Sequence, residues 1–263
     1  MERGIIHLPQ DTLTDVHAHI CDPVFDPDRG EVIRRAGDAG ISSIIAVSET
    51  PADAQKNLAL AEEYHEILPA AGLYPTILDF DQAELTVNLI RRNHHRLTAI
   101  GEVGLDYWKV GDEEDRIIQR EIFSSFIELG REFDLPLNIH SRSAGHYVIE
   151  MLLEAGVKRA LLHAFDGRAS ASLPAVEAGY YFSIPPSVVR SRQKQKLVKK
   201  LPLSAILLET DSPVLGPVPN QRNEPANLII ALKAVAELKN LTERVVREAV
   251  IDNFNRLFAK RAN

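Results

Sequence analysis

The sequence contains a single cysteine, Cys21, among 263 residues. One cysteine excludes an intrachain disulfide and a cysteine-based zinc site, and it favours a reducing compartment in which the thiol acts as a small buried hydrophobe. Long apolar runs are also missing. Residues 1–15 hold only Ile5, Ile6 and Leu8 as an apolar cluster, which is too short for a signal-peptide core or a membrane span. These absences predict a cytoplasmic protein without a membrane segment.

An excess of positive charge is missing as well, because 30 Lys and Arg against 37 Asp and Glu leave a net charge of −7. This balance argues against nucleic-acid binding over the whole surface, but it leaves room for a local basic groove. Residues 190–200 hold six Lys or Arg and no acid. This basic run fits either a solvated helix face or a patch that follows a DNA backbone.

Short apolar or β-branched runs alternate with longer amphipathic stretches along the whole chain, without a break in composition. The strand candidates are residues 13–20, 42–48, 67–75, 97–106, 136–142, 159–165, 180–186 and 205–211. Strand followed by helix, eight times, predicts a parallel sheet that is covered by helices on both faces. The length fits one (β/α)8 TIM barrel over residues 1–263, with an open doubly wound sheet as the alternative.

Helix candidates lie between these strands. Residues 51–67 open with a proline that suits a first helical turn. In residues 114–133 the apolar positions recur at helical spacing, at Ile118, Ile122, Phe126 and Leu129. Residues 241–260 predict one extra amphipathic helix at the C-terminal end of the chain.

Polar residues recur at the C-terminal ends of the strand candidates, which is where the catalytic groups of a (β/α)8 barrel converge. They are His17, His19, Glu102, His140, His163, Glu209 and Asp211. Because side chains alternate along a strand, Asp15, His17 and His19 should share one face, and so should Glu209 and Asp211. These residues are therefore expected to meet in one cleft.

Buried imidazoles and carboxylates are costly unless something neutralises them, and a divalent metal fits nitrogen and oxygen ligands without thiolates. A single histidine at a strand end also fits a hydrogen-bonded core residue, but four at matching ends favour a catalytic metal site. Glu102 is able to bridge two ions. Asp15 and Glu209 are expected to orient the ligands rather than bind a metal.

Two neighbouring ions can hold a hydroxide nucleophile and polarise a phosphoryl or carbonyl oxygen, so the pattern predicts a hydrolase. Asp211 is the candidate for metal ligand and general base together. The candidate phosphate contacts are Arg142, two residues after His140, and Arg168 and Arg222 in loops after motif residues. Each of these arginines also fits a solvated surface position.

An ordered set of motifs resembles the TatD-type metal-dependent deoxyribonucleases, which are amidohydrolase-like barrels. The matching segments are DVHAHI, AIGEVGLDY, PLNIHSR, HAFDG and LLETDSP, followed by RNEP and NRLF. HSRSAG, HAFDGR and FSIPPSVVRS are similar to the branch represented by the third TatD-domain-containing deoxyribonuclease of animals.

The resemblance implies two divalent ions, and the ligand types together with a phosphodiester substrate fit Zn, Mn or Mg. It implies His17, His19, Glu102 and Asp211 around one ion, and Glu102, His140 and His163 around the other. It further implies hydrolysis of DNA phosphodiester bonds, exonucleolytically on single strands or 3′ ends, without an obligate protein partner.

One segment departs from the family pattern. Where the family usually carries Gly-Ile/Val-His-Pro, this chain has Gly72, Leu73, Tyr74 and Pro75. Tyr74 fits a hydrogen-bond donor to a phosphate oxygen, a ring that stacks on a base, or simple packing at the rim. Two rival functions also remain. One is a small-molecule amidohydrolase or esterase on the same barrel, and the other is a non-catalytic nucleic-acid-binding barrel.

Overall fold

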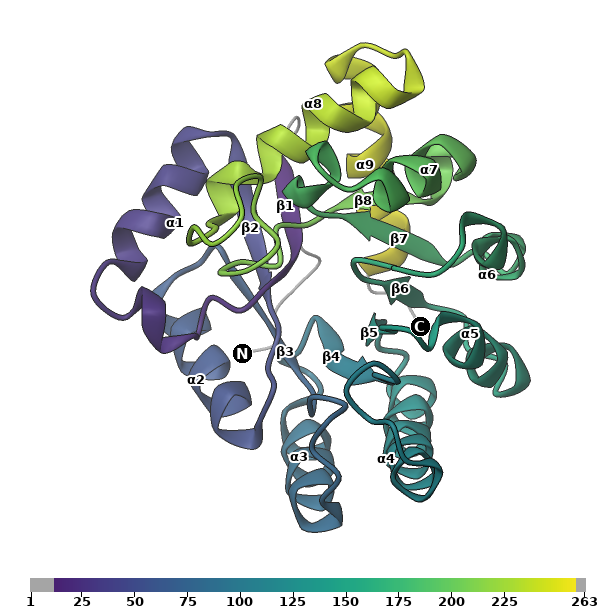
Figure 1. Cartoon of the computed structure of the whole chain (residues 1–263). Helices are drawn as coiled ribbons and strands as arrows, with labels where there is room; N and C mark the ends of the chain where they lie inside the picture. Colours follow the sequence, from purple (N-terminus) through teal and green to yellow (C-terminus); the bar gives the residue numbers. More distant parts are fainter. Residues whose placement is uncertain (1–11, 259–263) are drawn as a thin grey trace.

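The computed structural model describes residues 12–258. Eight parallel strands follow one another around a barrel in chain order, from β1 to β8 (Figure 1). They are β1 (Leu13–Ala18), β2 (Ile41–Ala46), β3 (Ile67–Ala71), β4 (Ala99–Gly104), β5 (Leu137–His140), β6 (Ala160–Leu162), β7 (Tyr181–Ile184) and β8 (Ile206–Leu208). The sequential order confirms the predicted TIM barrel and excludes the doubly wound alternative, whose strand order reverses.

Helices surround the strands (Figure 1). The α-helices are α1 (Arg29–Asp38), α2 (Pro51–Glu63), α3 (Phe80–Asn93), α4 (Glu113–Glu132), α5 (Gly145–Glu154), α6 (Leu173–Glu177), α7 (Arg192–Lys200), α8 (Leu228–Lys239) and α9 (Glu243–Phe258). Short 3-10 helices are η1 (Pro23–Phe25), η2 (Ala169–Ser172), η3 (Pro186–Val189), η4 (Leu203–Ala205) and η5 (Pro225–Asn227). The helix α9 confirms the extra C-terminal helix.

Local sequence explains where these helices begin and which face they bury. The Thr50 side chain accepts from the Asp53 backbone N–H, and Asp53 accepts in return, which forms a capping box in front of Pro51. On α4 the predicted apolar stripe faces the core, since Ile122, Phe126 and Leu129 are buried there and Ile118 is partly buried.

The barrel closes between β8 and β1 through the chain that follows β8. Asp211 N donates to His17 O (2.9 Å), and His19 N donates to Ser212 O (2.8 Å). The buried Asp15 carboxylate adds a brace, because it accepts from the backbone N–H of Thr210 (2.8 Å) and from its hydroxyl. These contacts hold the ends of the first and last strands together.

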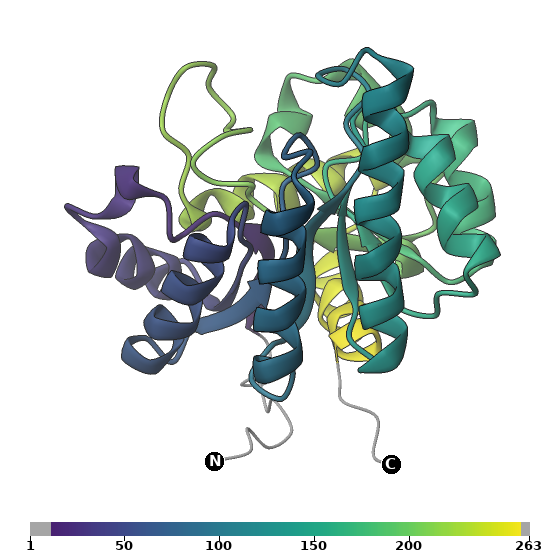
Figure 2. The ribbon, with the colours of Figure 1, turned by 90° about the horizontal axis from the view of Figure 1, so that it is seen from below.

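The two ends of the barrel differ. In Figure 2, α9 (yellow) lies at the lower end of the barrel, and the loop after β8 (yellow-green) rises from the opposite end. Phe254, Leu257 and Phe258 of α9 form one buried apolar cluster with strand residues such as Val16 and Leu207. Among residues 12–258, no helix is both long enough and apolar enough to cross a membrane.

Candidate metal centre

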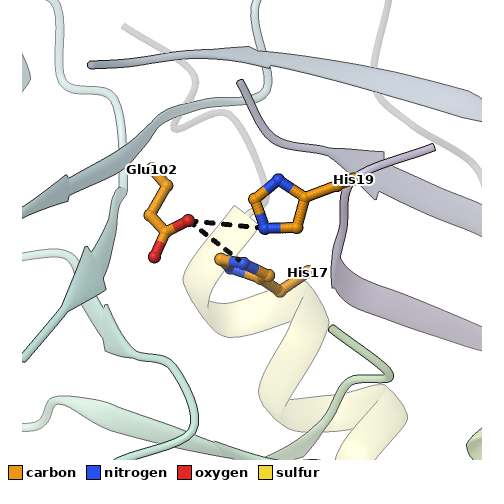
Figure 3. Close-up of side chains that lie close together, drawn as sticks. All are labelled: His17, His19 and Glu102. Atoms are coloured by element: carbon orange, nitrogen blue, oxygen red, sulfur yellow. Dashed lines mark ion pairs between the residues drawn. The ribbon is translucent and has the colours of Figure 1, made fainter. Parts of the chain in front are cut away.

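The first cluster of polar side chains joins the end of β1 to β4 and to the segment after β8. His17 Nε2 lies 3.8 Å from Glu102 Oε2 and 3.5 Å from Asp211 Oδ1. His19 Nε2 lies 3.4 Å from each of the same two oxygens. Figure 3 shows both imidazoles pointing toward the Glu102 carboxylate. The structure therefore brings together the four residues predicted for one ion.

The second cluster uses the other oxygen of Glu102. Oε1 lies 2.6 Å from His140 Nδ1 and 2.8 Å from His163 Nε2, and these two nitrogens are 3.3 Å apart. Because Oε2 faces the first cluster and Oε1 the second, Glu102 has the geometry of a bridging carboxylate. These are the three residues predicted for the second ion.

The donor atoms fit divalent cations. His17 Nε2 and Glu102 Oε2 are buried and have no hydrogen-bond partner. Such an unsatisfied buried group costs about 1–3 kcal/mol. Nitrogen and oxygen ligands bind Zn²⁺ at about 2.0–2.2 Å, which spaces neighbouring ligand atoms by roughly 3–4 Å. The spacing in the first cluster, 3.4–3.8 Å, is of this size, whereas Glu102 Oε1 lies at hydrogen-bond distance from His140 and His163. The described residues contain three overlapping groups able to hold an ion.

Asn138, which was not among the residues predicted from the sequence, fixes the tautomer of His17. Asn138 Nδ2 donates to Val16 O (2.8 Å), so its Oδ1 faces His17 and accepts from the ring Nδ1–H (2.8 Å). The lone pair of His17 then lies on Nε2, toward Glu102 and Asp211. A signal was present in the sequence, because Asn138 precedes His140 by two and so shares its strand face.

Asp106 orients His140 in a similar way and was also missed. Its Oδ2 accepts from His140 Nε2–H (3.1 Å), which directs Nδ1 toward Glu102. Its Oδ1 accepts from the backbone N–H groups of Trp108 and Lys109 (3.0 and 2.9 Å). The signal was an acid at the end of the strand candidate that carries Glu102.

The two predicted orienting acids contact backbone N–H groups and hydroxyl groups, and Glu209 also lies near the His163 ring. Asp15 accepts from His17 N (3.3 Å) in addition to Thr210, and it does not touch the imidazole rings. Glu209 Oε1 accepts from Ala164 N (2.8 Å), and Oε2 accepts from Ser183 Oγ (2.5 Å) and lies 3.7 Å from His163 Nδ1. Both acids thus support the segments that carry the ligands.

The electrostatics of the centre favour bound cations. Burial lowers the pKa of His17 to about 3, with help from His163, so its imidazole is neutral. Burial alone would raise the pKa of Glu102, but His163 and His140 outweigh it and hold the pKa well below its usual range. Burial would lower the pKa of His140, yet Glu102 and Asp106 raise it to about 10. The ionised carboxylates therefore stabilise positive charge at the centre.

Asp211 reaches the centre by a route that strand alternation did not predict. The strand β8 ends at Leu208, and Asp211 has a φ of 54°. Ser143 and Ala164, in the segments after β5 and β6, also have positive φ values (55° and 42°). Left-handed backbone in non-glycine residues is costly and concentrates at functional sites. The prediction that Glu209 and Asp211 share one face of a strand is thus wrong in its reason, because neither residue lies in β8. Both carboxylates nevertheless lie at the centre.

Glycine at position 104 permits the close contact between β4 and β5. Its φ is 141°, and a Cβ atom there would collide with the carbonyl oxygen of His140. A side chain at this position would therefore displace a ligand-bearing strand end.

A cavity of about 480 Å³ opens beside the centre and has His140, His163 and Asp211 in its wall. Tyr74 and Arg142 also line it. The Tyr74 ring meets His140 edge-on at a centroid distance of 5.3 Å. The Arg142 guanidinium lies 3.7 Å from the centre of the exposed Trp108 ring.

The two other predicted substrate contacts lie elsewhere. Arg168 is exposed in the loop before η2 and does not line the cavity. Arg222 donates to the Asp28 carboxylate through Nη1 and Nη2 (2.8 and 2.6 Å) and lies over the Phe25 ring. The structure therefore brings only Tyr74 and Arg142 of the four predicted contacts to this cavity.

The basic run at residues 190–200 contains α7 and divides into two parts. Arg192, Lys196, Lys199 and Lys200 are exposed, as expected for a solvated helix face. Lys194 is buried and lines the cavity. Burial lowers the pKa of its ammonium group, against the opposing effect of Glu209, Asp211 and Asp166.

Comparison with known proteins gives consistent matches over nearly the whole chain. The family model described as "TatD related DNase" matches residues 14–259. "Deoxyribonuclease TATDN3" of Homo sapiens is 42% identical over 260 residues, which cover 94% of this chain and 95% of the human protein. "Uncharacterized metal-dependent hydrolase YabD" of Bacillus subtilis is 32% identical over 254 residues, 94% of this chain and 98% of that protein.

A solved structure matches equally well. The crystal structure of YjjV, a TatD homologue from Escherichia coli K12, has a TM-score of 0.87 at 27% identity. The alignment covers 94% of this chain and 97% of that one. The structural similarity therefore extends over nearly the whole of both chains.

Proposed function

Since this chain belongs to the TatD-related DNase family, we propose that it is a divalent-metal-dependent deoxyribonuclease. The single observation that carries the proposal is the convergence of five candidate ligand residues around Glu102. The unpartnered Glu102 Oε2 faces one group of ligands, and Oε1 faces the other. We further propose one domain, without an obligate protein partner; its predicted bounds, residues 1–263, extend beyond the described residues 12–258.

Two ions are proposed, one held by His17, His19, Glu102 and Asp211, and the other by Glu102, His140 and His163. Bound divalent ions would lower the pKa of a water molecule and offset the charge that develops on phosphoryl oxygens. The mixed imidazole and carboxylate ligands suit Zn or Mn, and phosphate substrates often recruit Mg.

The protein groups have separable roles in this proposal. Asp211 takes a proton from the attacking water, because its carboxylate lines the cavity and is ionised. Burial acts to raise the pKa of Asp211, but the hydrogen bond from His19 and the nearby His17 hold it below the usual value. Asn138 and Asp106 keep the rings of His17 and His140 in the ligand orientation.

The cavity surroundings support a single-stranded DNA end as substrate. The Trp108 side chain is 59% exposed beside Arg142, and exposed aromatic rings stack on unpaired bases. Arg142 is placed to donate to a backbone phosphate. Cys21, buried and unpaired by a disulfide, fits the reducing environment of the cytoplasm, which is the location we propose.

The test is a time course with a 5′-labelled single-stranded DNA oligonucleotide and metal-stripped protein. Mg, Mn and Zn are added back in parallel, with Asp211→Asn as the control variant. A ladder of products that requires metal and disappears in the variant is expected, and its pattern reveals the direction of attack. Metal binding without cleavage under any ion would contradict the proposal, and hydrolysis of p-nitrophenyl esters or lactones would then identify a small-molecule hydrolase.

A further inference from the structure

Lys194 differs from the other lysines of the basic run. It lies in the first turns of α7, where its backbone N–H donates to the N-cap side chain of Ser191 (3.3 Å). The residue is only 8% exposed, whereas Lys196, two positions further along the same helix, is exposed. The side chain of Lys194 therefore belongs to the interior face of α7 and not to its solvated face.

The ammonium group of Lys194 is only partly satisfied by the protein. Its Nζ donates to the carbonyl oxygen of Ala164 (2.8 Å). Within residues 12–258, it forms no ion pair, as no carboxylate oxygen lies within 4.0 Å. An ammonium group has three donors, and a buried charge is costly unless it is paired. Two donors thus remain for a ligand.

The position of these donors indicates which ligand they fit. Lys194 lines the cavity that also has His140, His163 and Asp211 in its wall. Ala164, which holds Nζ, directly follows the ligand His163. The Asp166 carboxylate at the same cavity accepts from Ser143 N (3.1 Å). A compact anion between the metal centre and α7 would complete the hydrogen bonding of the ammonium group.

We propose that Lys194 binds a phosphate oxygen of the substrate next to the metal centre, with Arg142 as the second cation of the same cavity. This inference rests on the proposed function, which makes the substrate a phosphodiester. The basic run then has two roles, since Lys194 contacts the phosphate in the cavity and the exposed lysines solvate α7. In this proposal Lys194 contacts the substrate directly. A hydrogen bond between an ammonium group and a phosphate oxygen is short and strong, so it requires this contact.

Two substitutions separate the charge of Lys194 from its structural hydrogen bond. Lys194→Gln removes the charge but retains an N–H donor for the Ala164 carbonyl group. Lys196→Gln makes the same change on the exposed face of the same helix and is the matched control. Metal content and thermal unfolding of both variants show whether the metal centre and the fold are intact.

The experiment measures kcat/KM for single-stranded DNA and the inhibition constant of inorganic phosphate, both with metal-loaded protein. Lys194→Gln is expected to lower kcat/KM and to weaken phosphate binding by about 10- to 100-fold, the range for a lost charged hydrogen bond. Lys196→Gln is expected to stay within about twofold of the wild type. Wild-type values for Lys194→Gln in both measurements would overturn the inference and leave the proposed function standing.

Direct phosphate binding keeps the two proposals distinguishable. If the wild type cleaves no DNA, calorimetric titration with inorganic phosphate still tests Lys194. Loss of phosphate binding in Lys194→Gln alone supports the inference, and equal binding overturns it.

A measurement on the wild type covers the case in which Lys194→Gln does not fold. Inorganic phosphate should slow acetylation of Lys194 by acetic anhydride and leave Lys196 unaffected, as read by mass spectrometry. Phosphate-independent labelling of Lys194 would overturn the inference.

Discussion

The two ends of this barrel are built from the same strands but differ in what they bury, apolar side chains at one end and polar side chains at the other. At the end covered by α9, Val16 and Leu207 pack with Phe254 and Leu257 in an apolar cluster. The residue that follows Val16 on β1, His17, faces the other end. It is equally buried, but its Nε2 has no hydrogen-bond partner. Burial alone therefore does not distinguish the two ends; the satisfaction of the buried atoms does.

The difference shows how stability and function are distributed. Apolar burial at the α9 end favours folding and requires no ligand. The ligand end holds buried charges and left-handed backbone at Ser143, Ala164 and Asp211, all of which cost free energy. We expect substitutions at the α9 end to change stability and substitutions at the ligand end to change chemistry.

The largest effect is expected from Glu102→Gln, which removes the carboxylate shared by both clusters. The variant should bind less than the full complement of metal and lose about 10³-fold or more in kcat, because both ligand groups lose their common charge. Metal analysis and DNA cleavage rates measure this. Glu132→Gln, whose carboxylate pairs with Arg91 on the surface, serves as the control. Full metal content and activity in Glu102→Gln would refute the bridging role.

Phe254→Ala tests the opposite end. Phe254 is 4% exposed and stacks on Phe258 at a centroid distance of 5.0 Å. Its removal should lower the free energy of unfolding by about 3–5 kcal/mol, as is usual for a buried aromatic residue. Urea unfolding measures the loss, and kcat per folded molecule should stay unchanged. Normal stability with an impaired kcat in this variant would contradict the proposal that the α9 end determines stability and the other end determines chemistry.

Asp106→Asn probes how the ligands are oriented. The amide oxygen of asparagine can still accept from the backbone of Trp108 and Lys109, but the charged acceptor for His140 Nε2–H is lost. Metal affinity is expected to fall by about 10- to 100-fold, as is typical for partners of ligating histidines. Competition with a metal chelator measures this change. Asp38→Asn, on the surface of α1, is the matched control.

Tyr74→Phe addresses the position where the family usually has histidine. The substitution keeps the ring against His140 and removes only the hydroxyl group. If that group donates to a phosphate, KM for DNA should rise about 10-fold, the lower end of the range for a hydrogen bond to a charged group, with little change in kcat. An unchanged KM would instead assign the ring to packing at the rim or to base stacking.

The smallest effect is expected from Asp28→Asn, at an exposed brace between loops. The hydrogen bond from Arg222 lowers the pKa of Asp28 to about 2, below its ordinary value of 3.8. A lowered pKa in the folded state stabilises the fold above the unfolded value. The difference in stability between wild type and variant should therefore be present at neutral pH and fade as the pH falls from about 4 toward 2. Urea unfolding of both proteins across this pH range measures the difference. A stability difference that stays constant from about pH 4 to about 2 would contradict the prediction.

The strand and helix pattern was predictable from sequence because it depends on local periodicity and on chain length. The ends of the strands were less predictable. Residues 205–211 read as one strand, but β8 covers only Ile206–Leu208, since the backbone turns to deliver Asp211. An apolar run does not reveal the residue at which strand pairing stops.

The sequence by itself determined the barrel and indicated the six candidate ligand residues, because strand order and the residues at strand ends are properties of the linear chain. Only the tertiary structure decided how these residues are held. The contact between His17 and Asn138 spans 121 residues, and the contact between His140 and Asp106 spans 34. Likewise, the burial of Lys194 depends on how α7 packs beside the segment after β6. Partners distant in sequence meet only when the barrel closes, so their pairing cannot be derived from local pattern.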